Sequence, residues 1–393
     1  MNIVHISPSA PYNDGWGFQE NLLPKYHAKL GHNVTLIVST KVHQDGKIVT
    51  GEPASYPSRD GFSVITLPYV RYPERHMTTV FAKLDVYGLL QQLKPDFVFY
   101  HGLLSATIFD VIRYKKQRKK AGFPCCIVQD NHLDYNIGNV PKTLRKKLLR
   151  AYYRLLNACT QSHVDKIYGV TPWRKQYAED YYRISPDKTD VLIMGADDEK
   201  IDFPNREQIR ARIREMYQIA DDDFLIVTGG KIDERKKIHI LMEACGDMEG
   251  VKLLVFGSVL DQMQEHYQAL VDRYPNIISI GWVNADAVYD YFFAADLVCF
   301  PGQHSVLWEQ ACASKVPCVF ARWPGMDHVD NGGNAEFVDE ITPQGIRSKL
   351  EKLRFTDAYS RMKAKAESEL TDIYLYSEIA KKSIEILENR ETD

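Results

Sequence analysis

Long hydrophobic runs are absent from this sequence of 393 residues. No window approaches the roughly 18 continuous apolar residues that a membrane-spanning helix needs. The first residues, MNIVHISPSAP, also lack the basic segment and apolar core of a secretion signal. We therefore expect neither a transmembrane helix nor a secretion signal.

Cysteine is scarce, and its spacing is not that of a metal site. The seven cysteines stand at positions 125, 126, 159, 245, 299, 312 and 318. Several lie in apolar runs, where a reduced cysteine packs as a small hydrophobic residue, so the cytoplasm is the expected location. No DxD-type aspartate pair is placed to hold a catalytic metal, and we predict no metal.

Charge is unevenly distributed, although the net charge is only −3. Residues 1–190 contain 26 Lys and Arg against 16 Asp and Glu, whereas residues 191–393 contain 23 against 36. Much of the positive charge lies in residues 113–120 and 142–156. No nucleic-acid-binding motif accompanies these two basic segments, so nucleic acid is not an expected partner.

The second basic segment places Leu144, Leu148 and Leu155 on one stripe of a predicted helix. Two interpretations stay open. One is an ordinary helix whose leucines face the core and whose cations face water. The other is a helix that contacts an anionic membrane surface, which would place the protein peripherally at the inner face of the membrane.

Short apolar strands alternate with amphipathic helices along the chain. A strand at 2–7, a loop containing Gly15 and Gly17, a helix at 18–32 and a strand at 34–40 form a β-α-β unit, which implies a parallel sheet. Further strands are predicted at 62–68, 96–102, 125–131 and 166–171. The first half of the chain is therefore predicted to be one doubly wound domain.

A second alternating series follows an acidic, turn-prone stretch at 196–205. Strands are predicted at 224–230, 251–257, 276–283, 295–302 and 316–322. Helices are predicted at 206–217, 237–247, 259–273, 285–294, 306–314, 343–354 and 357–390. We expect two α/β domains, 1–195 and 196–369.

The segment FLIVTGGKIDERKKIHILMEA, residues 224–244, joins a strand to an amphipathic helix through a glycine pair. Gly229 and Gly230 permit a tight turn and a close approach of ligand to the backbone. Four cations follow: Lys231, Arg235, Lys236 and Lys237. Because ligands bind at the carboxyl ends of strands in open α/β sheets, this segment predicts a diphosphate site, with a merely solvated basic turn as the alternative.

The chain resembles the retaining glycosyltransferases of family 4, and the resemblance rests on motifs that occur in the family's order. They are LGHNVTLIV, DFVFYHG, QDNH, VTPW, MGADDEKIDF, GGKIDERKK, and ADLVCFPG followed by HSVLWEQACASKVPCV. The resemblance implies the GT-B fold, with two Rossmann-like domains facing a cleft. It also implies a nucleotide-sugar donor in the second domain, an acceptor site mainly in the first, and a helix over about 370–393 that packs back on the first.

The resemblance assigns the diphosphate contacts. Lys231 stands where the family usually has arginine, and Lys236 matches the family's lysine. Both would neutralise the diphosphate as it leaves. Arg235 is expected to compensate for the missing arginine, and Gly230 to bring the backbone close to the donor.

Glu309 matches the second glutamate of the family's E-x7-E signature, which accepts hydrogen bonds from ribose hydroxyls. Eight positions earlier the chain has Pro301, so Gln303 or His304 is expected to replace the first glutamate. The alternative for Glu309 is a surface carboxylate. Phosphate oxygens are expected to bind the backbone N–H groups of Ser305, Val306 and Leu307.

In the first domain, His132 of QDNH matches a family histidine that lies near the transferred sugar. His101 of FYHG and Asp130 are assigned to the acceptor side. The alternative for both histidines is a structural role. All three residues lie at the end of a predicted strand, where the ligand is expected.

Two further contacts are implied by the resemblance. The loop with Gly15 and Gly17 would approach the diphosphate, or else form a simple turn. Trp282 and Val283 fall where the family contacts the nucleotide base, although Trp282 fits a core position equally well.

The implied reaction moves a hexosyl unit from a nucleotide diphosphate sugar, expected to be a UDP-sugar, to an acceptor hydroxyl with retention of configuration. His132, Lys231 and Lys236 are the expected catalytic residues, and no cofactor beyond the donor is expected. The acceptor is expected to be a lipid-linked or cell-surface saccharide, with a soluble acceptor as the alternative. A nucleotide-sugar epimerase, a phosphorylase and a non-catalytic binding subunit of the same fold stay open.

Overall fold

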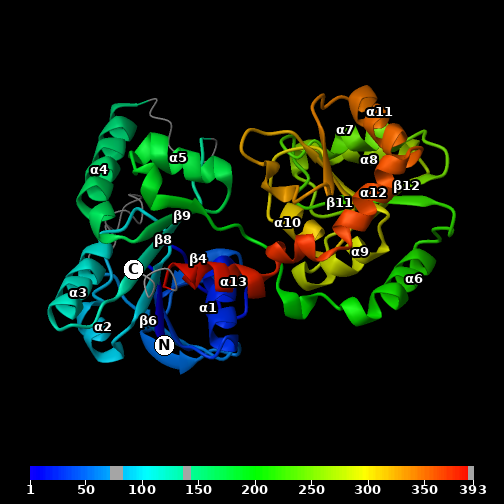
Figure 1. The fold of residues 1–393 in the computed structure, drawn as a ribbon. Coiled ribbons are helices and arrows are strands. Elements are labelled where there is room, and N and C mark those ends of the chain that lie inside the picture. The colour runs from blue at the N-terminus through cyan, green and yellow to red at the C-terminus, as the bar shows by residue number, and fades with distance from the viewer. Residues whose placement is uncertain (71–82, 136–142, 388–393) are drawn as a thin grey trace. The chain divides into compact units, whose positions relative to one another are not determined.

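The computed structural model describes residues 1–70, 83–135 and 143–387 (Figure 1). The chain divides into two compact units. Unit 1 comprises Met1–Ile193 and Ile379–Asp393, and unit 2 comprises Met194–Glu378. The chain thus leaves unit 1 two residues before the expected domain boundary and returns to it near its C-terminal end.

Unit 1 contains an eight-stranded sheet in the order β10-β9-β8-β7-β1-β2-β6-β5, parallel except for the β5–β6 pair. The strands are Asn2–Ser7 (β1), Asn33–Ser39 (β2), Ala54–Pro57 (β5), Ser63–Leu67 (β6), Phe97–Tyr100 (β7), Cys126–Asn131 (β8), Lys166–Gly169 (β9) and Thr189–Val191 (β10). The winding direction reverses between β1 and β7, so the carboxyl ends of these strands form the expected ligand-binding edge.

Helices cover both faces of this sheet. They are Gln19–Lys29 (α1), Tyr87–Leu93 (α2), Ile108–Lys120 (α3), Leu144–Thr160 (α4), Pro172–Tyr182 (α5) and the end of Tyr376–Ile384 (α13). Residues Val4 and Ile6 of β1 join the core beneath α2 to α5. The intervening His5 faces the other side, where α1 and α13 lie beside each other (Figure 1).

Unit 2 contains a six-stranded parallel sheet in the order β13-β12-β11-β14-β15-β16. The strands are Phe224–Gly229 (β11), Val251–Phe256 (β12), Ile277–Gly281 (β13), Leu297–Phe300 (β14), Cys318–Ala321 (β15) and Ala335–Val338 (β16). Here the winding reverses between β11 and β14. The loops after these two strands therefore flank the expected ligand-binding edge.

The helices of unit 2 also lie on both faces of its sheet. They are Arg206–Met216 (α6), Ile238–Cys245 (α7), Gln264–Arg273 (α8), Val288–Ala294 (α9), Leu307–Ala313 (α10), Pro343–Arg354 (α11) and Asp357–Ala366 (α12). Helices α7, α8, α11 and α12 share one core with alternate residues of the strands. Burial on both faces explains why these strands are almost wholly apolar in sequence.

Every predicted strand is present with its ends within two residues of the prediction. Three further strands, β5, β10 and β16, were not predicted from the sequence. Nor was a hairpin formed by Lys41–Gln44 (β3) and Lys47–Thr50 (β4). The hairpin turn is Asp45-Gly46, and both residues have positive φ. This Asp-Gly turn was a readable hairpin signal.

The predicted helix at 357–390 is wrong as a single element. Helix α12 ends at Ala366, and a 3₁₀ helix, Glu369–Tyr374 (η8), precedes α13. The hydroxyl of Ser368 caps η8, and that of Thr371 donates to the Ala366 carbonyl at 3.0 Å. Short polar side chains compete in this way for backbone groups that a continuous helix would use.

Candidate active site

The glycine pair after β11 forms the predicted tight turn. Gly230 has φ +107°, a conformation that residues with a side chain rarely adopt. A Cβ on Gly229 would lie 2.5 Å from the Phe256 ring, and one on Gly257 would lie 1.8 Å from the Gly230 carbonyl oxygen. Only glycines let these two strand ends approach so closely.

Lys236 lies at the point where the winding of unit 2 reverses. Its Nζ donates to the backbone carbonyl of Gln303 at 2.7 Å and to that of His304 at 3.3 Å, so it joins the loops after β11 and β14. Burial lowers the pKa of Lys236 to about 8, although Asp233 and Glu309 favour its charged form. The lysine predicted to bind the diphosphate is thus half-buried, and it loses its proton at a lower pH than an ordinary lysine.

The neighbouring cations are arranged differently. Lys231 is exposed directly after the glycine turn. The guanidinium of Arg235 donates to Asp233 through Nη2 at 2.6 Å and through Nε at 3.0 Å. Lys237 forms an ion pair with Glu234 at 2.8 Å. Arg235 is therefore already engaged, and its role in compensating for Lys231 stays a prediction.

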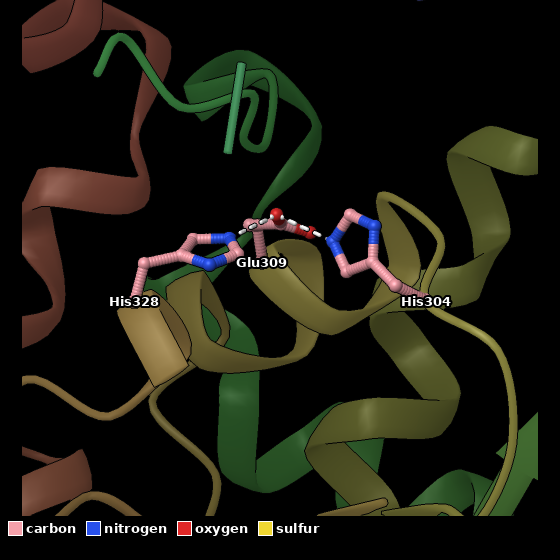
Figure 2. A group of neighbouring side chains, drawn as sticks. All are labelled: His304, Glu309 and His328. Carbon is pink, nitrogen blue, oxygen red and sulfur yellow. Dashed lines mark hydrogen bonds and ion pairs between the residues drawn. The ribbon is translucent and has the colours of Figure 1, made fainter. Parts of the chain in front are cut away.

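Glu309 is fully buried on α10 and lies between two histidines (Figure 2). Its Oε1 accepts hydrogen bonds from Nε2 of His304 and from Nε2 of His328, both at 2.8 Å. Burial raises the pKa of Glu309, but the two histidines outweigh burial and hold the pKa well below its usual value. Glu309 is thus no surface carboxylate, and that alternative is wrong.

The second oxygen of Glu309 has a different environment. Oε2 is buried and has no hydrogen-bond partner among the residues that the structure describes. A buried carboxylate oxygen without a partner is costly. Oε2 is therefore an unsatisfied acceptor that is closed to solvent in this structure.

His328 completes the site and was not found from the sequence. It lies on a 3₁₀ turn, Asp327–Val329 (η7), and its carbonyl accepts from the Tyr374 hydroxyl at 2.7 Å. The adjacent carbonyl of Val329 accepts from Asn334 at 2.9 Å. The only signal was a histidine in the polar, glycine-containing stretch MDHVDNGG after a strand.

His304, Glu309 and His328 also have the composition of a metal site, with ligand atoms within 4.8 Å of one another. Their contacts suit hydrogen bonds better, because both histidine nitrogens lie 2.8 Å from the same oxygen. The charge of Lys236 also acts on Glu309, and a second cation beside it would be repelled. The absence of a metal stays a prediction.

The remaining residues of unit 2 that are predicted to bind the donor lie at the same sheet edge. Ser305 and Val306 precede α10, which begins at Leu307. Val283 is half-buried just after β13. Trp282 is 71% exposed, so its interpretation as a core residue is wrong.

The glycine loop of unit 1 follows β1. Gly15 has φ +74°, and its carbonyl accepts from Nη2 of Arg59 at 2.5 Å. A Cβ at Gly15 would overlap the Arg59 guanidinium. Gly17 borders open space and does not have positive φ, so only Gly15 is required to be glycine by the backbone.

His101, Asp130 and His132 meet at the carboxyl ends of β7 and β8. Oδ2 of Asp130 lies 3.0 Å from Nδ1 of His101 and 3.3 Å from Nε2 of His132. Oδ1 accepts from the Gly102 N–H at 2.7 Å. Asp130 is fully buried, which raises its pKa, but His132 and His101 outweigh burial and lower it.

His132 is the accessible member of this group, with 36% of its side chain exposed. Burial lowers the pKa of His132, but the charge and hydrogen bond of Asp130 and the charge of Glu20 raise it above its usual value. Glu20 lies in the first turn of α1, beyond the glycine loop. Unit 1 thus presents a histidine that favours its charged form at the predicted ligand-binding edge.

Two family models match successive parts of the chain. The model described as Glycosyltransferase Family 4 matches residues 23–200, and the one described as Glycosyl transferases group 1 matches residues 223–354. The processive diacylglycerol alpha-glucosyltransferase of Acholeplasma laidlawii is 23% identical over 185 residues, which cover 44% of this chain. The match spans 55% of that relative's length.

Solved structures resemble the chain over its whole length. A glycosyltransferase from Rickettsia africae has a TM-score of 0.68 at 15% identity, with 98% of both chains covered. Anabaena HepE, solved in complex with UDP, has a TM-score of 0.65 at 14% identity, with 99% of this chain and 100% of that chain covered. These likenesses show the GT-B fold, and with the two family models they show that this chain belongs to the GT-B glycosyltransferases of the family 4 type.

Proposed function

We propose that this protein transfers a hexosyl unit from a UDP-sugar to an acceptor hydroxyl with retention of configuration. The observation that carries the proposal lies at the reversal point of unit 2: Lys236, a half-buried cation between two loops, and Glu309, a buried carboxylate with one unpaired oxygen. A cation and a hydroxyl acceptor close together suit a nucleoside diphosphate, which carries a ribose beside its phosphates. The complex of HepE with UDP supports the choice of nucleotide.

Lys236 and Lys231 would neutralise the diphosphate as it leaves. In the proposed step the bond from the anomeric carbon to the diphosphate oxygen breaks, and a bond to the acceptor oxygen forms on the same face of the sugar. The acceptor proton passes to the leaving phosphate. Because charge develops on the diphosphate, cations held beside it stabilise the transition state more than the ground state.

Glu309 would bind the ribose through Oε2, which donor binding must first expose, since this oxygen is buried here. His304 and His328 occupy its other oxygen and keep the carboxylate ionised. An ionised, buried acceptor forms strong hydrogen bonds with hydroxyl donors. Nε2 of His304 donates to Glu309. We therefore propose that His304 replaces the missing first glutamate indirectly, by orienting Glu309 rather than by contacting the sugar through Nε2.

His132 is proposed to act next to the transferred sugar. Asp130 favours the charged form of His132, so the side chain can donate a hydrogen bond to a sugar hydroxyl or a phosphate oxygen. His101 contacts Asp130 and is itself 4% exposed. We therefore assign His101 to the support of Asp130 rather than to acceptor contact.

Calorimetry with UDP tests the donor site. We expect wild-type protein to bind UDP and Lys236→Ala to bind it about 10- to 100-fold more weakly, the loss of a charged hydrogen bond. Lys352→Ala, which removes an exposed lysine of α11, is the matched control and should bind normally. Equal losses in both variants would contradict the site.

Product analysis separates the other functions of this fold. A glycosyltransferase consumes UDP-sugar in proportion to a glycosylated acceptor, and the anomeric proton of the product reports retention. Release of an epimerised UDP-sugar without acceptor would identify an epimerase. Binding of UDP without any donor consumption would identify a non-catalytic subunit.

A membrane-linked acceptor is the second part of the proposal. Leu144, Leu148 and Leu155 of α4 are 73%, 63% and 64% exposed, so the interpretation of this stripe as core-facing is wrong. Ala151 and Ala158 extend the same exposed stripe. Exposed leucines in helical register are unusual on a protein that contacts only water.

Basic residues accompany the exposed stripe. Arg145 and Lys147 of α4 are exposed, as are Lys116, Lys119 and Lys120 of the neighbouring α3. Among the described residues no helix is long and apolar enough to cross a bilayer. An apolar stripe beside cations suits the interface of an anionic membrane, and the diacylglycerol named for the Acholeplasma relative supports a lipid acceptor.

A further inference from the structure

Three buried histidines of unit 1 form a hydrogen-bonded line that ends at Asp130. Nε2 of His101 lies 3.1 Å from Nδ1 of His5, and Nε2 of His5 lies 2.9 Å from Nδ1 of His27. Nε2 of His27 lies 2.8 Å from the Ser383 hydroxyl. His5, His27 and Ser383 are fully buried. The line therefore runs from Asp130, beside His132, to the last helix.

The charge of Asp130 favours one direction for the hydrogen bonds in this line. An ionised carboxylate only accepts, so Nδ1 of His101 must carry its proton. In a neutral ring the other nitrogen is then an acceptor. His101 therefore accepts from Nδ1–H of His5, and His5 in turn accepts from Nδ1–H of His27.

The final donor is Ser383. With its proton on Nδ1, His27 needs a donor at Nε2, and the hydroxyl of Ser383 is in place. The Ala380 carbonyl opposes this arrangement, because it lies 2.8 Å from the same hydroxyl and 3.2 Å from Nε2 of His27, and it can only accept from either. If Ser383 turned to Ala380, His27 would carry its proton on Nε2, the whole line would reverse, and a bare Nδ1 of His101 would face Asp130.

Burial keeps His5 and His27 neutral. Burial lowers the pKa of His5 well below its usual value, with His27 and His101 adding to the effect. Burial lowers the pKa of His27 to about 3, and the neighbouring His32 lowers it further, against the Ala380 carbonyl. The rings of His5 and His27 therefore transmit hydrogen-bond direction without carrying charge at neutral pH.

We propose that His5, His27 and Ser383 are positioning residues that fix His101 with its proton toward Asp130 and thereby hold the Asp130–His132 pair in place. The role of that pair in sugar transfer rests on the proposed function, whereas the hydrogen-bond direction does not. Ser383 lies on α13, the segment by which the chain returns to unit 1. The position of α13 in unit 1 is thus linked to the hydrogen bonds that Asp130 accepts.

Long-range ¹H–¹⁵N NMR of the histidine rings in the full-length protein tests the direction. We expect His5, His27 and His101 all in the Nδ1–H form, which is the less favoured tautomer of free histidine. In Ser383→Ala, His27 should change to the Nε2–H form and donate to Ala380. Wild-type His27 with its proton on Nε2, or no change of tautomer in Ser383→Ala, would overturn the proposal.

The same variants separate positioning from simple stability. Lys382→Ala, an exposed residue beside Ser383 on α13, should leave all three tautomers and the His132 titration unchanged. In Ser383→Ala we expect the His132 pKa, followed by NMR, to rise above its wild-type value, because Asp130 loses the His101 donor and its charge then acts more strongly on His132. A normal His132 titration with a changed His27 tautomer would show that the buried histidines stabilise the fold but do not influence the Asp130–His132 pair. Failure of sugar transfer in the wild type would overturn the proposed function and leave the tautomer result standing.

Discussion

At the scale of single residues, burial disfavours the charged form of both groups that we assign to donor binding, but the surroundings compensate for burial only at Glu309. Lys236 is a cation whose pKa burial has lowered to about 8, and Glu309 is a carboxylate whose pKa two histidines hold low. In the proposed site the donor would supply negative charge to Lys236, which now donates only to backbone carbonyls, and hydroxyl donors to Glu309.

The pKa of Lys236 predicts a pH dependence of UDP binding. The ammonium form binds the diphosphate, and in the free protein it is lost as pH rises through about 8. The dissociation constant should therefore rise by up to about tenfold per pH unit above that value. Calorimetry from pH 7 to 10 measures it. Lys236→Arg, which stays charged over this range, should remove the dependence; a dependence that persists would assign it to another group.

Glu309 predicts discrimination at the ribose. We expect wild-type protein to bind UDP more tightly than 2′,3′-dideoxy-UDP, and Glu309→Gln to lose most of this preference, because the amide is a weaker acceptor. The loss should be about tenfold, the size of a hydrogen bond to a charged group. An undiminished preference in Glu309→Gln would place the ribose elsewhere. Zinc binding to the wild type, abolished in His328→Ala, would instead indicate a metal site.

At the scale of elements, the turn between β11 and α7 depends on one backbone conformation. Gly230→Ala combines a positive φ of +107° with a Cβ 3.1 Å from Leu307. We expect it to lower the free energy of unfolding by about 1–3 kcal/mol, measured by urea denaturation. Gly88→Ala in α2, which meets open space, is the control and should be neutral or stabilising. A neutral Gly230→Ala would show that the turn relaxes freely.

The exposed stripe of α4 predicts membrane binding. Replacing Leu144 and Leu148 together by serine should weaken binding to anionic vesicles by at least about tenfold, because two partly buried leucines each contribute roughly 1 kcal/mol or more. Leu370→Ser, which changes an exposed leucine of η8, should not. Vesicle sedimentation at two salt concentrations separates the apolar contribution of the leucines from the electrostatic contribution of the cations, since added salt weakens only the electrostatic attraction. Binding that ignores lipid charge and both leucines would remove the membrane from the proposal.

At the scale of the whole molecule, the chain crosses between its units at residues 193–194 and again at 378–379. Within unit 2 the two crossing segments are joined, because Ala196 N–H donates to the Tyr374 carbonyl at 2.8 Å and Tyr376 N–H donates to the Ala196 carbonyl at 3.0 Å. After the second crossing, Ile379, Ala380 and Ser383 are buried in unit 1. The end of α13 is therefore buried in the first unit.

Deleting the chain from Ile379 onward should destabilise unit 1 selectively. We expect amide hydrogen exchange to accelerate in α1, which loses the contact of His27 with Ser383, while β11 of unit 2 keeps its protection. Lys382→Ala serves as the control for α13 and should leave both units protected. Equal loss of protection in the two units would show that they unfold together.

The sequence by itself determined the features that depend on neighbours in the chain. Short apolar strands, most of them four to seven residues long and buried on both faces, determined the α/β class, and the glycine pair with Lys236 determined the turn after β11. Sequence periodicity did not determine which environment an amphipathic helix faces. The leucines of α4 have the same helical spacing whether they face a core or water, so periodicity alone left their environment open.

Only the tertiary structure decided how distant polar residues combine. Glu309 and His328 are 19 positions apart, His5 and His101 are 96 apart, and His27 and Ser383 are 356 apart. Such contacts arise from sheet order and from the return of the chain to unit 1, and neither leaves a local pattern in the sequence. A histidine within an apolar strand, as in NIVHIS, shows that a buried partner must exist, but the fold alone determines which one it is.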